Sequence, residues 1–179
     1  MTQTSTAAEQ TLNWIRSFII KFNICPFAKG PVNKGTLRIT VSETKKRVQA
    51  LEELMKEIDF LNESASMETT LLIFTNQFND FFAYLDFVDL AEQLMQSQGY
   101  EGVYQLATFH PDYYFNDTEP DDVTNYTNRS PYPMIHILRE DSLEKAITAY
   151  GHTEQIPENN IRTMRQLGLN KIQEILNKA

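Results

Sequence analysis

The order of strand-like and helix-like segments is the feature that most constrains the fold of this chain. Residues 36–41 alternate polar and apolar side chains, as in a strand at a sheet edge, and residues 70–75 form a short apolar run typical of a central strand. A helix-like apolar periodicity follows each of them, over residues 48–61 and 81–94, before a third predicted strand at residues 103–110. Because a helical connection returns the chain to the starting edge of the sheet, these three strands are predicted to be parallel, with right-handed crossovers.

A fourth strand is predicted over residues 134–139. It follows the third strand without an intervening helix, so we expect the two to be antiparallel. The chain is therefore predicted to be an α/β protein, with a mixed four-stranded sheet and helices packed on it. The remaining helices are predicted over residues 6–23, over residues 141–150 and from Pro157 onward, with an interruption near Gly168. The length of 179 residues and the 41% hydrophobic composition predict a single domain, residues 1–179.

The overall charge and composition limit the partners of this protein. The formal net charge is −8, so a polyanion would be repelled, and no nucleic acid partner is expected. No apolar stretch approaches the length of a membrane span, and the first ten residues lack the pattern of a secretion signal. Because the single cysteine, Cys25, also forms no internal disulfide, we expect a cytoplasmic protein without a membrane partner. The oligomeric state is not predicted.

The connection between the third and fourth predicted strands, residues 111–133, is far longer than an ordinary loop. Its tyrosines argue against disorder, and long ordered loops are often functional. Ligands of open α/β sheets usually bind where parallel strands end, and His110 ends the third strand there. The same argument brings His136, near the start of the fourth strand, to that edge of the sheet.

A stiff, polar segment within this loop predicts an anion site. Pro131 and Pro133 restrict the backbone around Asn128, Arg129 and Ser130. Arg129 offers a planar fork for a carboxylate or phosphate, while Asn128 and Ser130 add neutral donors. A small anionic molecule is therefore the predicted ligand. The alternative is that Arg129 pairs with one of the acidic side chains of its own loop.

The histidines suit two kinds of chemistry. His110, expected to be exposed at a strand end, is the candidate general acid or base. A divalent metal held by His110, His136 and Asp122 is the alternative, although their spacing matches no metal-binding signature. His136 lies among apolar neighbours and is more typical of a buried, hydrogen-bonded core residue.

Cys25 admits two opposed interpretations, which depend on where the local helices begin and end. A cysteine that ends the first helix would have its thiolate disfavoured, whereas one that precedes a new turn with Pro26 at its first position would have it favoured. Cys25 is thus a candidate nucleophile, while an inert, buried thiol is the simpler alternative.

Several motifs together resemble a family of small bacterial proteins classed as a domain of unknown function. The matching segments are Cys25-Pro26-Phe27-Ala28 with Arg38 downstream, residues 105–111, the region of Asp122 and Asn125, residues 127–133, residues 136–140, and the tail around residues 156–168. The resemblance implies no reaction, cofactor or catalytic residue. It implies only that Cys25, Arg38, His110, Asn128, Arg129 and His136 belong to the recurring pattern, which makes Arg38 a second candidate anion contact.

Three functions therefore stand as hypotheses. The first is an enzyme acting on a small carboxylate or phosphate metabolite, with His110 and Cys25 in catalysis and Arg129, Arg38, Asn128 and Ser130 binding the substrate. The second is a protein that binds a divalent metal, with hydrolysis as the reaction such a metal could support. The third is a non-catalytic domain whose loop tyrosines contact a partner protein. Apart from the metal of the second hypothesis, the sequence does not identify a cofactor.

Overall fold

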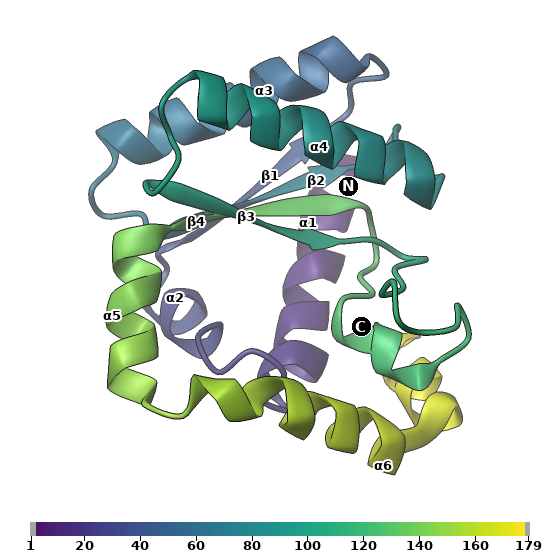
Figure 1. Ribbon diagram of the computed structural model, residues 1–179. Helices are drawn as coiled ribbons and strands as arrows, with labels where there is room; N and C mark the ends of the chain where they lie inside the picture. Colours follow the sequence, from purple (N-terminus) through teal and green to yellow (C-terminus); the bar gives the residue numbers. More distant parts are fainter. Residues whose placement is uncertain (1–2, 178–179) are drawn as a thin grey trace.

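The computed structural model describes residues 3–177, and one four-stranded sheet with helices on both faces organises them (Figure 1). The strands are β1 (Leu37–Ser42), β2 (Thr69–Phe74), β3 (Tyr104–Phe109) and β4 (Met134–Arg139). The helices are α1 (Gln3–Trp14), α2 (Lys29–Lys34), α3 (Arg47–Glu63), α4 (Phe81–Ser97), α5 (Glu140–Tyr150) and α6 (Ile156–Leu176). Three short helical segments complete the fold, a π-helix η1 (Ile15–Ile20) and the 3-10 helices η2 (Val123–Thr127) and η3 (Thr153–Gln155). The predicted α/β class is confirmed.

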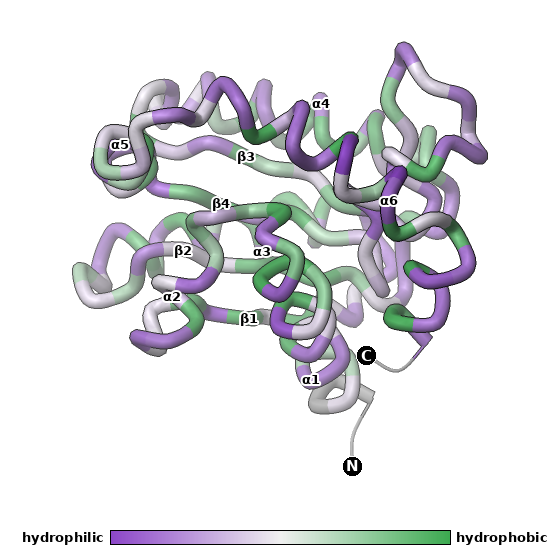
Figure 2. Tube along the Cα trace, turned by 90° about the horizontal axis from the view of Figure 1, so that it is seen from below, coloured by the Kyte–Doolittle hydropathy of each residue, from purple (hydrophilic) through white to green (hydrophobic). Residues whose placement is uncertain are grey.

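The strands lie in the order β1-β2-β4-β3, which Figure 2 shows from below. The predicted parallel pairing is right only for β1 and β2, because β4 lies between β2 and β3 and is antiparallel to both. Burial explains this order. Ile135 and Ile137 on β4 are fully buried, whereas Gln105 on β3 is exposed, so the more apolar strand takes the central place.

Helices α3 and α4 cover one face of the sheet (Figure 1). Alternate residues of the central strands, such as Leu72 and Ile135, point to this face and pack with Leu54 of α3 and Phe87 of α4. Every residue of β2 is buried, as its continuous apolar run predicts. This layer is the larger, aromatic-rich part of the core.

The opposite face is covered by α1, α2, α5 and α6 (Figure 1). Trp14 and Phe18 from the first helical region and Met164 from α6 pack against Leu71 and Met134 of the central strands. Both views place α2 and α5 near the same end of the sheet (Figures 1 and 2). Every residue of α5 is at least partly exposed, so α5 packs more loosely than its neighbours.

The long loop between β3 and β4 is ordered by Asn125, which is fully buried. Its Nδ2 donates to the carbonyl oxygen of Glu119 at 2.8 Å, and its Oδ1 accepts from the Thr118 hydroxyl at 2.7 Å and the Phe115 amide at 3.2 Å. Asp122 caps η2 through the Thr124 amide at 2.8 Å. The aromatic residues of the loop therefore belong to a folded segment.

Two glycines that the sequence predicts to end or interrupt a helix adopt left-handed geometry. Gly99 has a φ of 78° just beyond α4, and Gly168 interrupts α6 with a φ of 71° and a ψ of 160°.

Among the described residues, no helix combines the length and apolar character required to cross a membrane.

Candidate functional site

An apolar pocket of about 600 Å³ lies against the sheet face that carries α2 and α5. Leu71, Ala107 and Leu138 form part of its floor, and the first helical region contributes Trp14 and Ile15. Its lining also includes residues 24–28 and one side of α5. Apolar concave sites of this size commonly hold small molecules. Two residues singled out from the sequence, Cys25 and His136, also line this pocket.

His136 rises from the middle of β4 onto the pocket floor, opposite Leu71 of β2 and Ala107 of β3. Its Nε2 lies 2.6 Å from the hydroxyl oxygen of Thr69. The same hydroxyl donates its only hydrogen to the carbonyl oxygen of Ile137, also at 2.6 Å. Thr69 must therefore accept from His136, which places the imidazole proton on Nε2.

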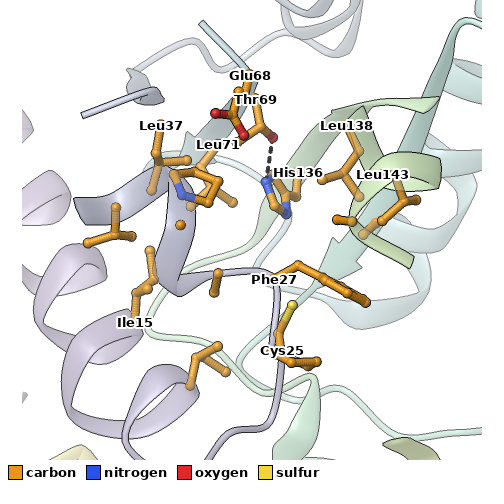
Figure 3. Close-up of a pocket in the computed structure, with 18 of the residues that line it drawn as sticks. Ile15, Cys25, Phe27, Leu37, Glu68, Thr69, Leu71, His136, Leu138 and Leu143 are labelled. Carbon is orange, nitrogen blue, oxygen red and sulfur yellow. Dashed lines mark hydrogen bonds between the residues drawn. The ribbon is translucent and has the colours of Figure 1, made fainter. Parts of the chain in front are cut away.

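The other ring nitrogen of His136, Nδ1, has no hydrogen-bond partner within residues 3–177 and points into the pocket (Figure 3). Burial lowers the pKa of His136 to about 4, because the imidazolium would lose its hydration. At neutral pH the ring is uncharged, so Nδ1 presents a lone pair to whatever occupies the pocket.

Cys25 enters the same pocket from the loop of residues 24–28, with its sulfur directed into the space below His136 (Figure 3). It precedes the turn that leads into α2, as in the second of its two interpretations. Burial nevertheless raises the pKa of the thiol, and this effect outweighs the backbone amides of Phe27 and Ala28, which lower it. The thiol is therefore protonated at neutral pH.

Two contacts border the pocket. Phe27 and Tyr150 meet edge to face with ring centroids 5.8 Å apart, joining the loop after Cys25 to the last residue of α5. Lys34 of α2 forms an ion pair with Glu68 at 3.4 Å. Both contacts involve α2 or α5, which have no buried residues, so this border of the pocket is formed by the less tightly packed parts of this face.

His110 lies at the predicted edge of the sheet, but it is fully buried rather than exposed. Its Nδ1 accepts from the Asp112 amide at 3.0 Å, so its Nε2 carries the proton and donates to the carbonyl oxygen of Phe78 at 2.7 Å. The ring also packs against Phe81 and Tyr84 of α4, and its burial lowers the pKa. The expectation of exposure is wrong because the loop folds back over the strand end.

The predicted anion-binding segment is held by contacts within the protein. Arg129 donates from Nε to the carbonyl oxygen of Tyr113 at 3.0 Å and from Nη2 to that of Pro120 at 2.6 Å. The Ser130 hydroxyl donates to the carbonyl oxygen of Tyr132 at 2.7 Å. Among the described residues, Arg129 therefore pairs with backbone carbonyl groups and not with an acidic side chain of its loop.

Asn128 is the member of that segment that reaches the pocket. Its Nδ2 donates to the carbonyl oxygen of Thr108 at 3.2 Å, and its own carbonyl oxygen accepts from the His110 amide at 3.3 Å. Asn128 therefore joins the end of β3 to the loop, and with Thr127 it carries this loop to the pocket of Cys25 and His136.

Arg38 lies on the other face of the sheet. Its Nε donates to Glu57 of α3 at 2.7 Å, and its guanidinium stacks on Phe60 with the central carbon 4.1 Å from the ring centroid. A substrate clamp of Arg38 with Arg129 would need both groups at one site, and the structure does not bring them together. The anion-binding role of these arginines stays a prediction.

The alternative metal set is not assembled. His110 packs against α4, His136 faces the pocket on the other side of the sheet, and Asp122 caps η2. Hydrogen bonds from Thr124 lower the pKa of Asp122. Within residues 3–177, three metal-ligating side chains do not converge anywhere. A metal site of His110, His136 and Asp122 stays a prediction that this geometry does not support, because the three side chains lie in separate parts of the fold.

Sequence reasoning missed the role of Thr69. The weak signal was a threonine at the start of a strand whose other residues are mostly apolar, because a hydroxyl buried there needs a partner. His136 carried a similar signal, a single polar residue within the apolar strand of residues 134–138. Nothing in the spacing showed that the two side chains would meet.

Comparison with known proteins gives a family but no activity. A family model described as "Protein of unknown function (DUF1415)" matches residues 6–174, nearly the whole chain. No curated protein and no solved structure matches significantly. This extent of matching shows that the chain belongs to the DUF1415 family of proteins of unknown function.

Proposed function

We propose that this protein binds a small, mainly apolar molecule in the pocket shared by Cys25 and His136. The observation that carries the proposal is the unpartnered Nδ1 of His136, which points into an apolar cavity of about 600 Å³. His136 is partly exposed in the pocket and its Nδ1 is accessible to water, so an apolar occupant would displace water from this acceptor. An occupant that supplies a donor keeps Nδ1 satisfied, whereas one without a donor leaves it unpaired at a cost in free energy. The cavity itself would otherwise leave a large apolar surface poorly packed.

The charged side chains of the lining support an uncharged occupant. Lys34 and Glu68 form an ion pair with each other. Arg139 donates through its guanidinium to carbonyl oxygens of Leu61, Ser64 and Met67 near the end of α3. Lys34 is thus neutralised by Glu68, and the hydrogen-bond donors of Arg139 are directed at carbonyl oxygens of the protein. An anion in the apolar part of the pocket would therefore lose its hydration without gaining a direct ion pair there. A small anionic metabolite as substrate, and catalysis by His110 or Cys25, stay predictions that this geometry does not support.

Filling the pocket tests the proposal. Ala146 of α5 lines the cavity, so Ala146→Phe places a ring inside it. Thr148→Phe adds the same ring at an exposed position of the same helix and is the matched control. Indole is a suitable probe because it is small, apolar and carries one N–H donor.

Backbone amide spectra recorded during an indole titration give the readout. We expect saturable shifts centred on residues 24–28 and His136 in the wild type and in Thr148→Phe, and their loss in Ala146→Phe. Shifts spread evenly over the surface, or unchanged in Ala146→Phe, would contradict binding in this pocket.

A further inference from the structure

The hydrogen-bond chain of Thr69 determines which side of the His136 ring can act as a donor. The Thr69 hydroxyl donates to the carbonyl oxygen of Ile137, a group that can only accept. The remaining role of Thr69 toward His136, at 2.6 Å, is that of an acceptor. The other tautomer would bring two lone pairs together at this distance, so the arrangement holds the imidazole proton on Nε2.

We infer that this arrangement makes the pocket selective for uncharged molecules that present an O–H or N–H donor to Nδ1 of His136. The inference rests on the proposed function and adds a chemical class to it. Phenols, alcohols and indole-like N–H compounds with an apolar body fit this class. Molecules that offer only acceptors, including ethers, ketones and carboxylates, would direct a lone pair at the lone pair of Nδ1.

The apolar surroundings of His136 strengthen the selection for molecules that carry a hydrogen-bond donor. Leu71, Ala107 and Leu138 lie beside it on the floor of the pocket, and these side chains provide no alternative hydrogen-bond donor or acceptor. A polar group that lies against these three side chains and does not meet Nδ1 would lack a partner there, which is the condition under which one hydrogen bond discriminates most strongly.

Thr69→Val tests the inference, because valine keeps the shape of threonine and removes the acceptor from Nε2. Without that acceptor, the His136 ring can carry its proton on either nitrogen. Thr70→Val is the matched control: Thr70 is the next residue of β2, its side chain is on the other face, and its hydroxyl has no partner among the described residues.

Indole and benzofuran are the two probes, since they have nearly the same shape and differ in having an N–H donor or an ether oxygen. We expect the wild type and Thr70→Val to bind indole roughly tenfold more tightly than benzofuran, as one hydrogen bond predicts. In Thr69→Val the two dissociation constants should approach each other. A long-range ¹H–¹⁵N spectrum of the wild-type histidine rings should also show the proton of His136 on Nε2.

The outcomes separate the two proposals. Equal binding of both probes in the wild type, with shifts at residues 24–28 and His136, would overturn donor selection and leave the pocket's binding function intact. A proton found on Nδ1 would overturn the inference even if Thr69→Val does not fold. The absence of pocket shifts with either probe would overturn the proposed function and this inference together.

Discussion

The carbonyl oxygen of Phe78 accepts a hydrogen bond from Nε2 of His110 at 2.7 Å, which joins the segment before α4 to the end of β3. Phe78 has a φ of 62°, in the left-handed region that a phenylalanine rarely adopts. Such a conformation costs free energy and persists where the surroundings favour it. His110 supplies part of those surroundings, together with Phe87, which stacks on the Phe78 ring, and Phe74, which meets it edge to face.

We therefore expect His110→Ala to lower the free energy of unfolding by about 3 kcal/mol, since it leaves a cavity and breaks one buried and one partly buried hydrogen bond. Urea denaturation followed by circular dichroism would measure the change. His152→Ala is the control, because the His152 side chain is 77% exposed, and it should change the stability little. A loss equal to that of His152→Ala would contradict the structural role assigned to His110.

The stability of the protein should fall in mildly acidic solution because of His136. Its pKa is about 4 in the folded protein and about 6.5 when the chain is unfolded, so the unfolded state binds the proton more strongly. The stabilisation is complete above about pH 6.5 and is lost progressively as the pH falls toward 4. Between pH 7 and pH 5, His136 alone should cost about 2 kcal/mol.

A comparison with His136→Gln isolates this contribution, because glutamine does not titrate and the carboxylates then contribute equally to both proteins. The difference in unfolding free energy between wild type and variant should shrink by about 2 kcal/mol from pH 7 to pH 5. Parallel pH profiles of the two proteins would show that His136 is not held in its neutral form by burial.

Arg38 and Glu57 form an ion pair in which only the arginine retains substantial exposure. Arg38→Met would leave the Glu57 carboxylate, 7% exposed, without its partner, and should cost about 2 kcal/mol. The double variant Arg38→Met, Glu57→Leu removes both charges and should recover most of that loss. Chemical denaturation of the two single variants and the double variant gives the coupling energy, and a coupling near zero would contradict this account.

Local patterns were enough to predict the strands, because burial on one or two faces leaves a periodicity of two or a continuous apolar run. The segments at residues 70–75 and 134–139 correspond closely to β2 and β4. The place of β4 between β2 and β3 was not predictable in the same way. It depends on which strand buries more surface once the helices are packed, and this is a property of the whole sheet.

The candidate site was predicted only in part, because the sequence indicates individual residues but not how the packed elements arrange them. The sequence singled out Cys25 and His136, but it placed His136 at the sheet edge with His110. The structure sets His136 in the middle of β4 and His110 on the α4 side. The pocket exists because α2 and α5, far apart in sequence, border the same end of the sheet. The contacts of Arg129 were not predictable either. Its partners are backbone carbonyl groups that the turns of the loop bring to it, and the spacing of residues alone does not reveal such turns.

Cys25 offers the most direct chemical test of the pocket, because it is the only cysteine and its labelling is unambiguous. Burial raises the pKa of its thiol, so the reactive thiolate is scarce at pH 8. We expect a disulfide-exchange reagent to label the folded protein much more slowly than the urea-unfolded chain, with a rate that continues to rise above pH 9. Indole should slow the labelling further by occupying the space that the reagent must enter.

Two comparisons separate low accessibility from low acidity at Cys25. Ala146→Phe, which fills the cavity, should slow labelling in the absence of indole, while Thr148→Phe should match the wild type. A small neutral alkylating reagent should show the same pH dependence as the larger one if the raised pKa limits the rate. Fast labelling at pH 6 would instead indicate a thiolate in the pocket. It would favour the hypothesis that Cys25 is a nucleophile over the interpretation of Cys25 as an inert thiol that lines the pocket.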